Sequence, residues 1–255
     1  MLTSLSPPVL LLVLLAGAVV SSEAGYWAGR VAGPRGADFD DQLSVVRGAI
    51  FALVAFLIGF AFSGAGSRHV DRLDVIVKEA NALGTAWLRA DTLPQPARSK
   101  LKEALREYTA DRLVMLQSDD TREVQRRLAQ VPALQDRIWK AGLEGTADSP
   151  QLALLVLPSL NDVIDLHTIH LSAAHRHIPA PIVVALLAGA ALSLMVAAFG
   201  NGQIAKRHSV LNFIYGFILS IALWMTIDLD YPRYGLIRSE ERRVGKECLA
   251  CVDLG

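Results

Sequence analysis

The chain has 255 residues, of which 52% are hydrophobic and only 20% are charged. Lysine and arginine (25) balance aspartate and glutamate (25), so no excess of positive charge indicates a nucleic-acid partner. The high apolar content excludes an intrinsically disordered chain. The counts of 19 glycines, 11 prolines and two cysteines exclude collagen-like and disulfide-rich proteins.

Four segments without any charged residue divide the chain. They cover residues 2–22, 48–67, 178–203 and 209–227. Each reaches the roughly 20 residues that an α-helix needs to cross about 30 Å of hydrocarbon. A backbone in lipid must satisfy its own hydrogen bonds, so the segments predict four transmembrane helices.

The first apolar segment has two interpretations. It could be the core of a signal peptide, but no lysine or arginine precedes it, as one normally does in a signal peptide. We therefore favour a retained helix over about residues 4–22, with Pro7 and Pro8 in its first turns. Residues 23–47, rich in glycine, are predicted to form a loop or interfacial turn.

The second apolar segment is predicted to form a helix over about residues 43–66 that continues into a long polar helix. Apolar residues keep a spacing of three to four without a helix breaker until residues 91–94. The next helix is expected to start at about residues 94–97. Two more are expected over about residues 120–142 and 150–175, with a loop over 142–150. No strand-like alternation occurs, so this region predicts a soluble helical bundle.

The predicted organisation is an all-α integral membrane protein in which two transmembrane hairpins flank the soluble bundle. The hairpins cover residues 1–66 and 178–230, and the bundle covers 67–177. In the second hairpin, Gly189 and Ser193, extended by Ala185, form a small-xxx-small pattern. Close helix packing and the ordinary composition of membrane helices explain that pattern equally well.

The end of the chain differs in composition from the rest. Residues 231–237 form a short C-terminal motif, and residues 238–255 resemble a translated sequencing adapter, which we expect to be non-native. The alternative is a genuine charged tail. Both cysteines, Cys248 and Cys251, lie in this tail, so the preceding chain has no cysteine for a metal or nucleophile site.

Polar residues on the first and last bundle helices form a candidate network. Those of the first helix are Glu79, Asn81 and Arg89, and those of the last are Asn161, Asp162 and Asp165. One interpretation is an ion-binding or gating network. The favoured one is a set of polar clamps that fix helix register, because buried polar groups must be paired in any case.

The sequence holds no recognisable enzyme motif, and no cofactor is expected. Four histidines, His167, His170, His175 and His177, form the one histidine cluster. His167 and His170 could share a metal ion, but no carboxylate-x-x-His pattern accompanies them. We therefore expect no metal site and a polar helix surface at the membrane interface.

Three stretches carry a resemblance to a known family. The first runs from Glu79 through Trp87 and Asp91 to Pro94, and the second is Leu160-Asn161-Asp162. The third contains Asp228, Asp230, Pro232 and Gly235. Together with two hairpins around a helical bundle, they resemble the bestrophin-like family of bacterial membrane proteins over about residues 25–237.

The resemblance implies a relation to bestrophins, which are pentameric anion channels with a helical cytosolic region. It implies a homo-oligomer, with a pentamer as the reference, chloride or another small anion as the permeant, and the lipid bilayer as surroundings. The counts of positive residues expected on the two sides of the membrane barely differ, so they do not decide the orientation. The resemblance therefore decides the expected location: the inner (plasma) membrane, with both termini and the bundle in the cytoplasm.

Bestrophin channels line a narrow neck with apolar residues spaced four apart on the second membrane helix. The matching positions here are Ala52, Phe56 and Phe60, although Ala52 lacks the bulk of the family pattern. A ring of such side chains can gate by dewetting. The alternative is a purely structural role, in which the phenylalanines face lipid or neighbouring helices. The alternative function is a non-conducting scaffold or sensor whose bundle binds a cytosolic partner.

Overall fold

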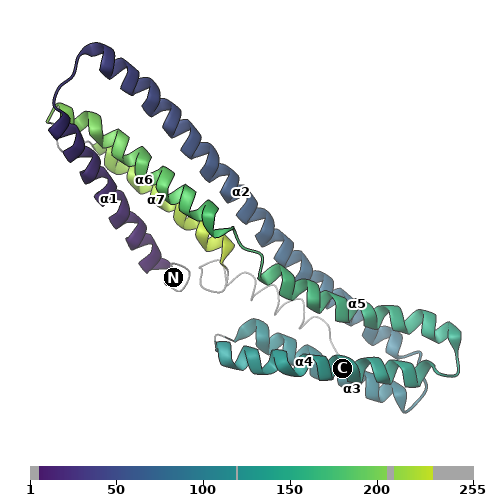
Figure 1. Cartoon of the computed structure of the whole chain (residues 1–255). Helices are drawn as coiled ribbons and strands as arrows, with labels where there is room; N and C mark the ends of the chain where they lie inside the picture. The colour runs from purple at the N-terminus through teal and green to yellow at the C-terminus, as the bar shows by residue number, and fades with distance from the viewer. Residues whose placement is uncertain (1–5, 119, 206–209, 232–255) are drawn as a thin grey trace. The chain divides into compact units, whose positions relative to one another are not determined.

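The computed structural model describes residues 6–118, 120–205 and 210–231, and within them it contains only helices (Figure 1). Seven α-helices follow one another in these ranges: α1 (Pro7–Ala32), α2 (Ala37–Ala90), α3 (Ala97–Gln117), α4 (Thr121–Thr146), α5 (Pro150–Ala174), α6 (Ala180–Gln203) and α7 (Val210–Asp230). The all-α prediction is confirmed. The chain divides into two compact units, and α2 contributes to both.

Of the described residues, the first unit contains 6–69, 177–205 and 210–231, which form α1, the first part of α2, α6 and α7. Its core joins α2, α6 and α7 through a cluster of aliphatic side chains: Val54, Ile58, Leu186, Ala190, Leu194, Leu219 and Leu223. Much of the outward surface is also apolar, including Leu12 and Phe213, which are 64% and 70% exposed. Such a surface is suited to contact with lipid rather than water.

The predicted loop over residues 23–47 is wrong. Helix α1 continues to Ala32, and only Gly33–Gly36 separate it from α2. The glycines that favoured a loop instead pack α1 against α6: a Cβ at Gly25 or Gly29 would collide with a backbone carbonyl oxygen of α6. Gly33 ends the helix at a φ of +69°, a conformation that glycine adopts without strain.

Within the part of the chain that the structure describes, five helices are long and apolar enough to cross a membrane: α1, α2, α5, α6 and α7. The predicted count of four is therefore not confirmed, because α5 joins the four expected spans. However, α5 belongs to the second unit, where Val156, Leu160 and Val163 are fully buried in a helical core. We therefore describe α5 with the bundle.

The second unit contains the end of α2 with α3, α4 and α5, within Val70–Arg176. All four helices contribute to one core, with Leu83, Leu105, Ile138 and Leu160 among its fully enclosed side chains. The unbroken α2 confirms the predicted continuation to residues 91–94. Asp120 and Ser149 cap α4 and α5 by accepting hydrogen bonds from backbone N–H groups.

The second correction concerns the predicted loop over residues 142–150. Helix α4 continues to Thr146, and only residues 147–149 connect it to α5. Gly142 faces the Leu160 side chain so closely that a Cβ would force this side chain to shift. Here again a glycine that indicated a helix end serves close packing inside a helix.

Candidate functional site

The face of α2 that carries the expected neck residues is open in the single chain. Phe56 is 62% exposed and Phe60 is 73% exposed, with their ring centroids 5.5 Å apart. Ala52, one turn earlier, is also exposed. Val54 and Ile58, on the opposite face, are buried with residues of α6 and α7. This aromatic face is therefore accessible to lipid or to another protein chain.

A buried ion pair joins α2 to α3 in the second unit. The Nε and Nη2 atoms of Arg112 donate to the two carboxylate oxygens of Glu79 at 2.5 and 2.7 Å. Glu79 is 1% exposed and Arg112 is 3% exposed. The two parallel contacts give the bidentate geometry that fixes both side chains.

Two further side chains complete the surroundings of Glu79. The Tyr108 hydroxyl donates to its Oε1 at 3.3 Å, and His170 Nδ1 lies 3.2 Å from its Oε2. Burial alone would raise the pKa of Glu79, but hydrogen bonds and charge from Arg112 and His170 outweigh burial and lower it. Burial and the Glu79 charge raise the pKa of Tyr108. Glu79 is thus held as a carboxylate, and Tyr108 as a neutral hydroxyl.

Sequence reasoning selected Glu79 as a network candidate but did not identify Arg112 as its partner. A signal was present: Arg112 lies four residues after Tyr108, on the apolar stripe of α3. A charged residue on the buried face of a helix requires a partner of opposite charge. The partner's identity has no local signal, because 33 residues separate Glu79 from Arg112.

Unlike the buried Glu79, the other network candidates lie on the surface. Asn81 and Arg89 of α2 and Asp162 and Asp165 of α5 line a groove of about 510 Å³ between the two helices. Arg89 Nη1 donates to the Leu155 carbonyl oxygen at 2.8 Å. The structure therefore separates the predicted network into a buried ion pair and an open groove.

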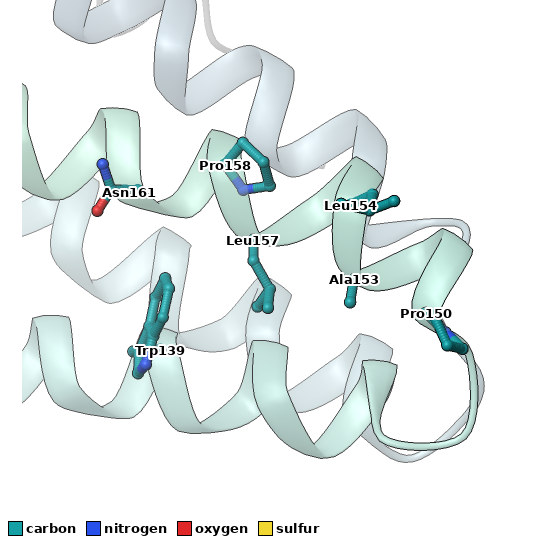
Figure 2. A pocket seen from close by; sticks show the side chains of 7 residues that line it. All are labelled: Trp139, Pro150, Ala153, Leu154, Leu157, Pro158 and Asn161. Carbon is teal, nitrogen blue, oxygen red and sulfur yellow. The ribbon is translucent and has the colours of Figure 1, made fainter.

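Asn161 lines a different hollow, between α4 and α5 (Figure 2). The volume of this hollow is about 610 Å³, and its wall consists of Trp139, Pro150, Ala153, Leu154, Leu157, Pro158 and Asn161. The Asn161 amide nitrogen donates to Asp165 Oδ2 at 2.7 Å. Asn161 therefore bonds a side chain of its own helix, and the hollow offers mainly carbon atoms.

The first family stretch closes the turn between α2 and α3. The Lys102 ammonium lies 4.4 Å from the centroid of the Trp87 ring and 2.7 Å from the Asp91 carboxylate. The Arg106 guanidinium lies over the same ring at 5.5 Å. Pro94 begins the turn into α3, because its carbonyl oxygen accepts from Arg98 N–H at 3.0 Å. These contacts hold the end of α2 against α3.

The third family stretch closes one end of the first unit. Asp230 is fully buried at the end of α7, and its carboxylate accepts from Arg68 Nε at 2.9 Å and from the Ile178 N–H at 2.7 Å. Its carbonyl oxygen lies 2.9 Å from His177 Nδ1. Asp228 is also buried. Asp230 thus ties α2, the start of α6 and the end of α7 together.

Some predicted positions lie outside the described residues. They are Pro232, Gly235, Cys248 and Cys251.

The four histidines do not form one site. His167 is buried and meets the Tyr108 ring edge-on at 6.3 Å, whereas His170 contacts Glu79. His175 contacts the Leu171 carbonyl oxygen, and His177 belongs to the first unit. Within the described residues, no group of three or more His, Cys, Asp or Glu side chains is arranged to hold a metal ion.

Comparison with known families decides the classification. The family model described as Bestrophin-like domain matches residues 15–241. The chain belongs to the bestrophin-like family. No curated protein sequence matches this bestrophin-like chain.

Solved structures share its fold. A bacterial bestrophin homologue from Klebsiella pneumoniae is 15% identical, with 95% of this chain and 96% of the homologue covered at a TM-score of 0.61. A variant of that homologue gives 13% identity, 94% and 97% coverage and a TM-score of 0.63. A structure described as a membrane protein is 17% identical, with 95% of this chain and 96% of that protein covered at a TM-score of 0.62. The TM-scores and the coverage show that the chain shares the fold of these proteins, and at such low identities they show the fold alone.

Proposed function

We propose that this bestrophin-like membrane protein assembles into a homo-oligomeric channel for chloride or another small anion. Bestrophins are pentameric anion channels, so a pentamer is the stoichiometry we propose. The proposed location is the inner (plasma) membrane, with both termini and the bundle in the cytoplasm. We propose no enzymatic reaction for the chain.

The observation that carries the proposal is the one-sided packing of α2. Its Val54 and Ile58 face is buried in the first unit, while the face with Ala52, Phe56 and Phe60 is open. In a ring of subunits, such faces can surround a central path. Apolar side chains at a constriction gate by dewetting, and the positive edges of aromatic rings attract an anion. Phe56 and Phe60 are the proposed constriction.

The test is chloride flux through proteoliposomes that contain the purified full chain. The variant Phe56→Ala/Phe60→Ala is expected to change flux or anion selectivity. The matched control is Phe213→Ala/Phe217→Ala, because these rings form a similar exposed i,i+4 pair on α7, with centroids 6.4 Å apart. Unchanged flux in the α2 variant, or an equal change in both variants, would reject Phe56 and Phe60 as the constriction.

The second candidate is a non-conducting scaffold or sensor whose bundle binds a cytosolic partner. The open groove between α2 and α5 supports it, because its lining offers polar and charged groups to a ligand. A folded, oligomeric sample without chloride flux would reject the channel and favour this candidate. The stoichiometry can be measured on the same sample by native mass spectrometry.

A further inference from the structure

The groove between α2 and α5 contains charged groups of both signs on facing walls. Lys78 and Arg89 contribute positive charge from α2, and Asp162 and Asp165 contribute negative charge from α5. Arg89 contacts the Leu155 carbonyl oxygen at one end, and Glu79 contacts His170 at the other, so the two helices run antiparallel. In this register both aspartates lie between Lys78 and Arg89.

Two of these charges have no partner among the residues that the structure describes. Neither Lys78 nor Asp162 makes a hydrogen bond or an ion pair there, so no nitrogen–oxygen contact within 4.0 Å joins Lys78 to either aspartate. Asp165 accepts only from the Asn161 amide. The facing charges therefore leave a gap that a ligand can bridge.

The rest of the lining is part polar, with Asn81, Thr85 and Ser159, and part apolar. Ala82 of α2 and Leu166 and Ile169 of α5 line the groove between and beside the charges, and Ile169 is 49% exposed. A simple anion would be attracted by Lys78 but repelled by the aspartates. A simple cation would be attracted by the aspartates but repelled by Lys78. A ligand with both charges and an apolar body satisfies all three features.

We propose that the α2–α5 groove binds a small zwitterion of the class of free apolar α-amino acids. Its carboxylate pairs with Lys78, its ammonium pairs with Asp162, and its side chain covers Leu166 and Ile169. The proposal does not depend on ion conduction, because every residue it uses belongs to the second unit.

The test is isothermal titration calorimetry on the full chain in lipid nanodiscs. The probes are L-leucine, 4-methylpentanoate, which lacks the ammonium, and 3-methylbutylamine, which lacks the carboxylate. Leucine is expected to bind, and each of the singly charged analogues is expected to bind about tenfold more weakly, because one charged hydrogen bond is lost. Equal binding of leucine and either analogue would overturn the proposal, as would the absence of leucine binding at millimolar concentration.

Two variants and a matched control locate the site. Lys78→Ala and Asp162→Asn are each expected to weaken leucine binding about tenfold, for the same reason. Both side chains are exposed, so neither change removes a core contact. The control variants Lys140→Ala and Asp136→Asn alter an exposed ion pair on α4 and should leave leucine binding unchanged. Equal losses in the control variants, or no loss in the groove variants, would refute the assignment.

Discussion

The stability of the bundle depends on each residue of the Glu79–Arg112 pair. Both side chains are enclosed among the helices of the second unit, and the carboxylate also contacts Tyr108 and His170. Removing two charges from water is unfavourable, and their mutual attraction offsets this loss only while both partners are present. The pair therefore makes correct packing of α2 against α3 a condition of stability.

Replacing one partner should be strongly destabilising. Arg112→Gln leaves the Glu79 carboxylate buried without its counter-charge, and we expect the free energy of unfolding to fall by about 3–5 kcal/mol. The measurement is denaturant unfolding of the purified full chain, followed by circular dichroism. Lys140→Gln, which breaks an exposed ion pair with Asp136, should cost less than about 1 kcal/mol. Similar losses in both variants would contradict a special role for the buried pair.

The lowered pKa of Glu79 predicts an acid-sensitive contribution to stability. Because the folded pKa lies below the ordinary value of 4.5, the unfolded chain takes up this proton first as the pH falls. The stabilisation is complete above pH 4.5 and is lost as the pH falls from there towards the folded pKa. The difference in unfolding midpoint between the wild type and Glu79→Gln should therefore shrink below pH 4.5.

An exposed glutamate supplies the control for this pH series. Glu107 pairs with Arg137 on the surface, where its side chain is half exposed. The difference between the wild type and Glu107→Gln should be small, because an exposed ion pair contributes little to stability. A Glu79→Gln difference that does not change with pH would show that Glu79 does not carry this titration.

At the scale of helices, the contact between α1 and α6 depends on the absence of side chains. A Cβ at Gly25 would collide with the Met195 carbonyl oxygen, and one at Gly29 with the Phe199 carbonyl oxygen. Gly202 of α6 faces the Tyr26 carbonyl oxygen in the same way. Such close backbone approach is a common basis of helix association in membranes.

Two glycine substitutions in α1 should therefore have different effects. Gly29→Ala forces α1 and α6 apart, and we expect a loss of about 1–3 kcal/mol, the range for overpacked cores. Gly17→Ala meets nothing within 4 Å and should be neutral or slightly stabilising, because alanine has the higher helix propensity. Thermal unfolding in detergent measures both variants, and equal midpoints would contradict the close contact.

Helix existence was predictable from the sequence, whereas contacts between helices were mostly not. The continuous apolar spacing predicted α2 through to its end at Ala90 because no breaker interrupts it. Gly25 and Gly29 were interpreted as loop residues, although their spacing of four also matches a helix-packing pattern. The small-xxx-small pattern at Gly189 and Ser193 has a different role: Ser193 is fully buried and accepts from the Tyr215 hydroxyl at 3.0 Å.

The candidate site was predictable only in part, for the same reason. Glu79 could be singled out, but its partners come from α3 and α5, and no local pattern in the sequence specifies which residues face it. The open face of α2 at Phe56 and Phe60 follows from the spacing of four together with the burial of the opposite face. What covers that face in an assembly is a property of more than one chain.

At the scale of the whole molecule, contacts within the first unit constrain how the chain crosses the membrane. The Gln203 amide donates to the Gly33 carbonyl oxygen at 3.2 Å, so the end of α6 lies beside the end of α1. Arg68 and the Ile178 N–H both contact Asp230, so the polar continuation of α2 starts at the end where α6 begins. The chain therefore leaves and re-enters the first unit at the same end. We therefore expect an even number of crossings between these points, whereas α5 alone would supply an odd number.

Cysteine labelling can distinguish four crossings from five. In a background with Cys248 and Cys251 replaced by serine, Asp38→Cys marks the start of α2 after the turn from α1, and Ile204→Cys marks the end of α6. With four crossings, a membrane-impermeant maleimide should label both positions from outside intact cells, and should label Lys140→Cys of α4 only after permeabilisation. A fifth crossing by α5 would place positions 38 and 204 on opposite sides. Labelling of only one of positions 38 and 204 would therefore contradict the four-span arrangement. Labelling of position 140 alone would show that the orientation is opposite to the proposed one.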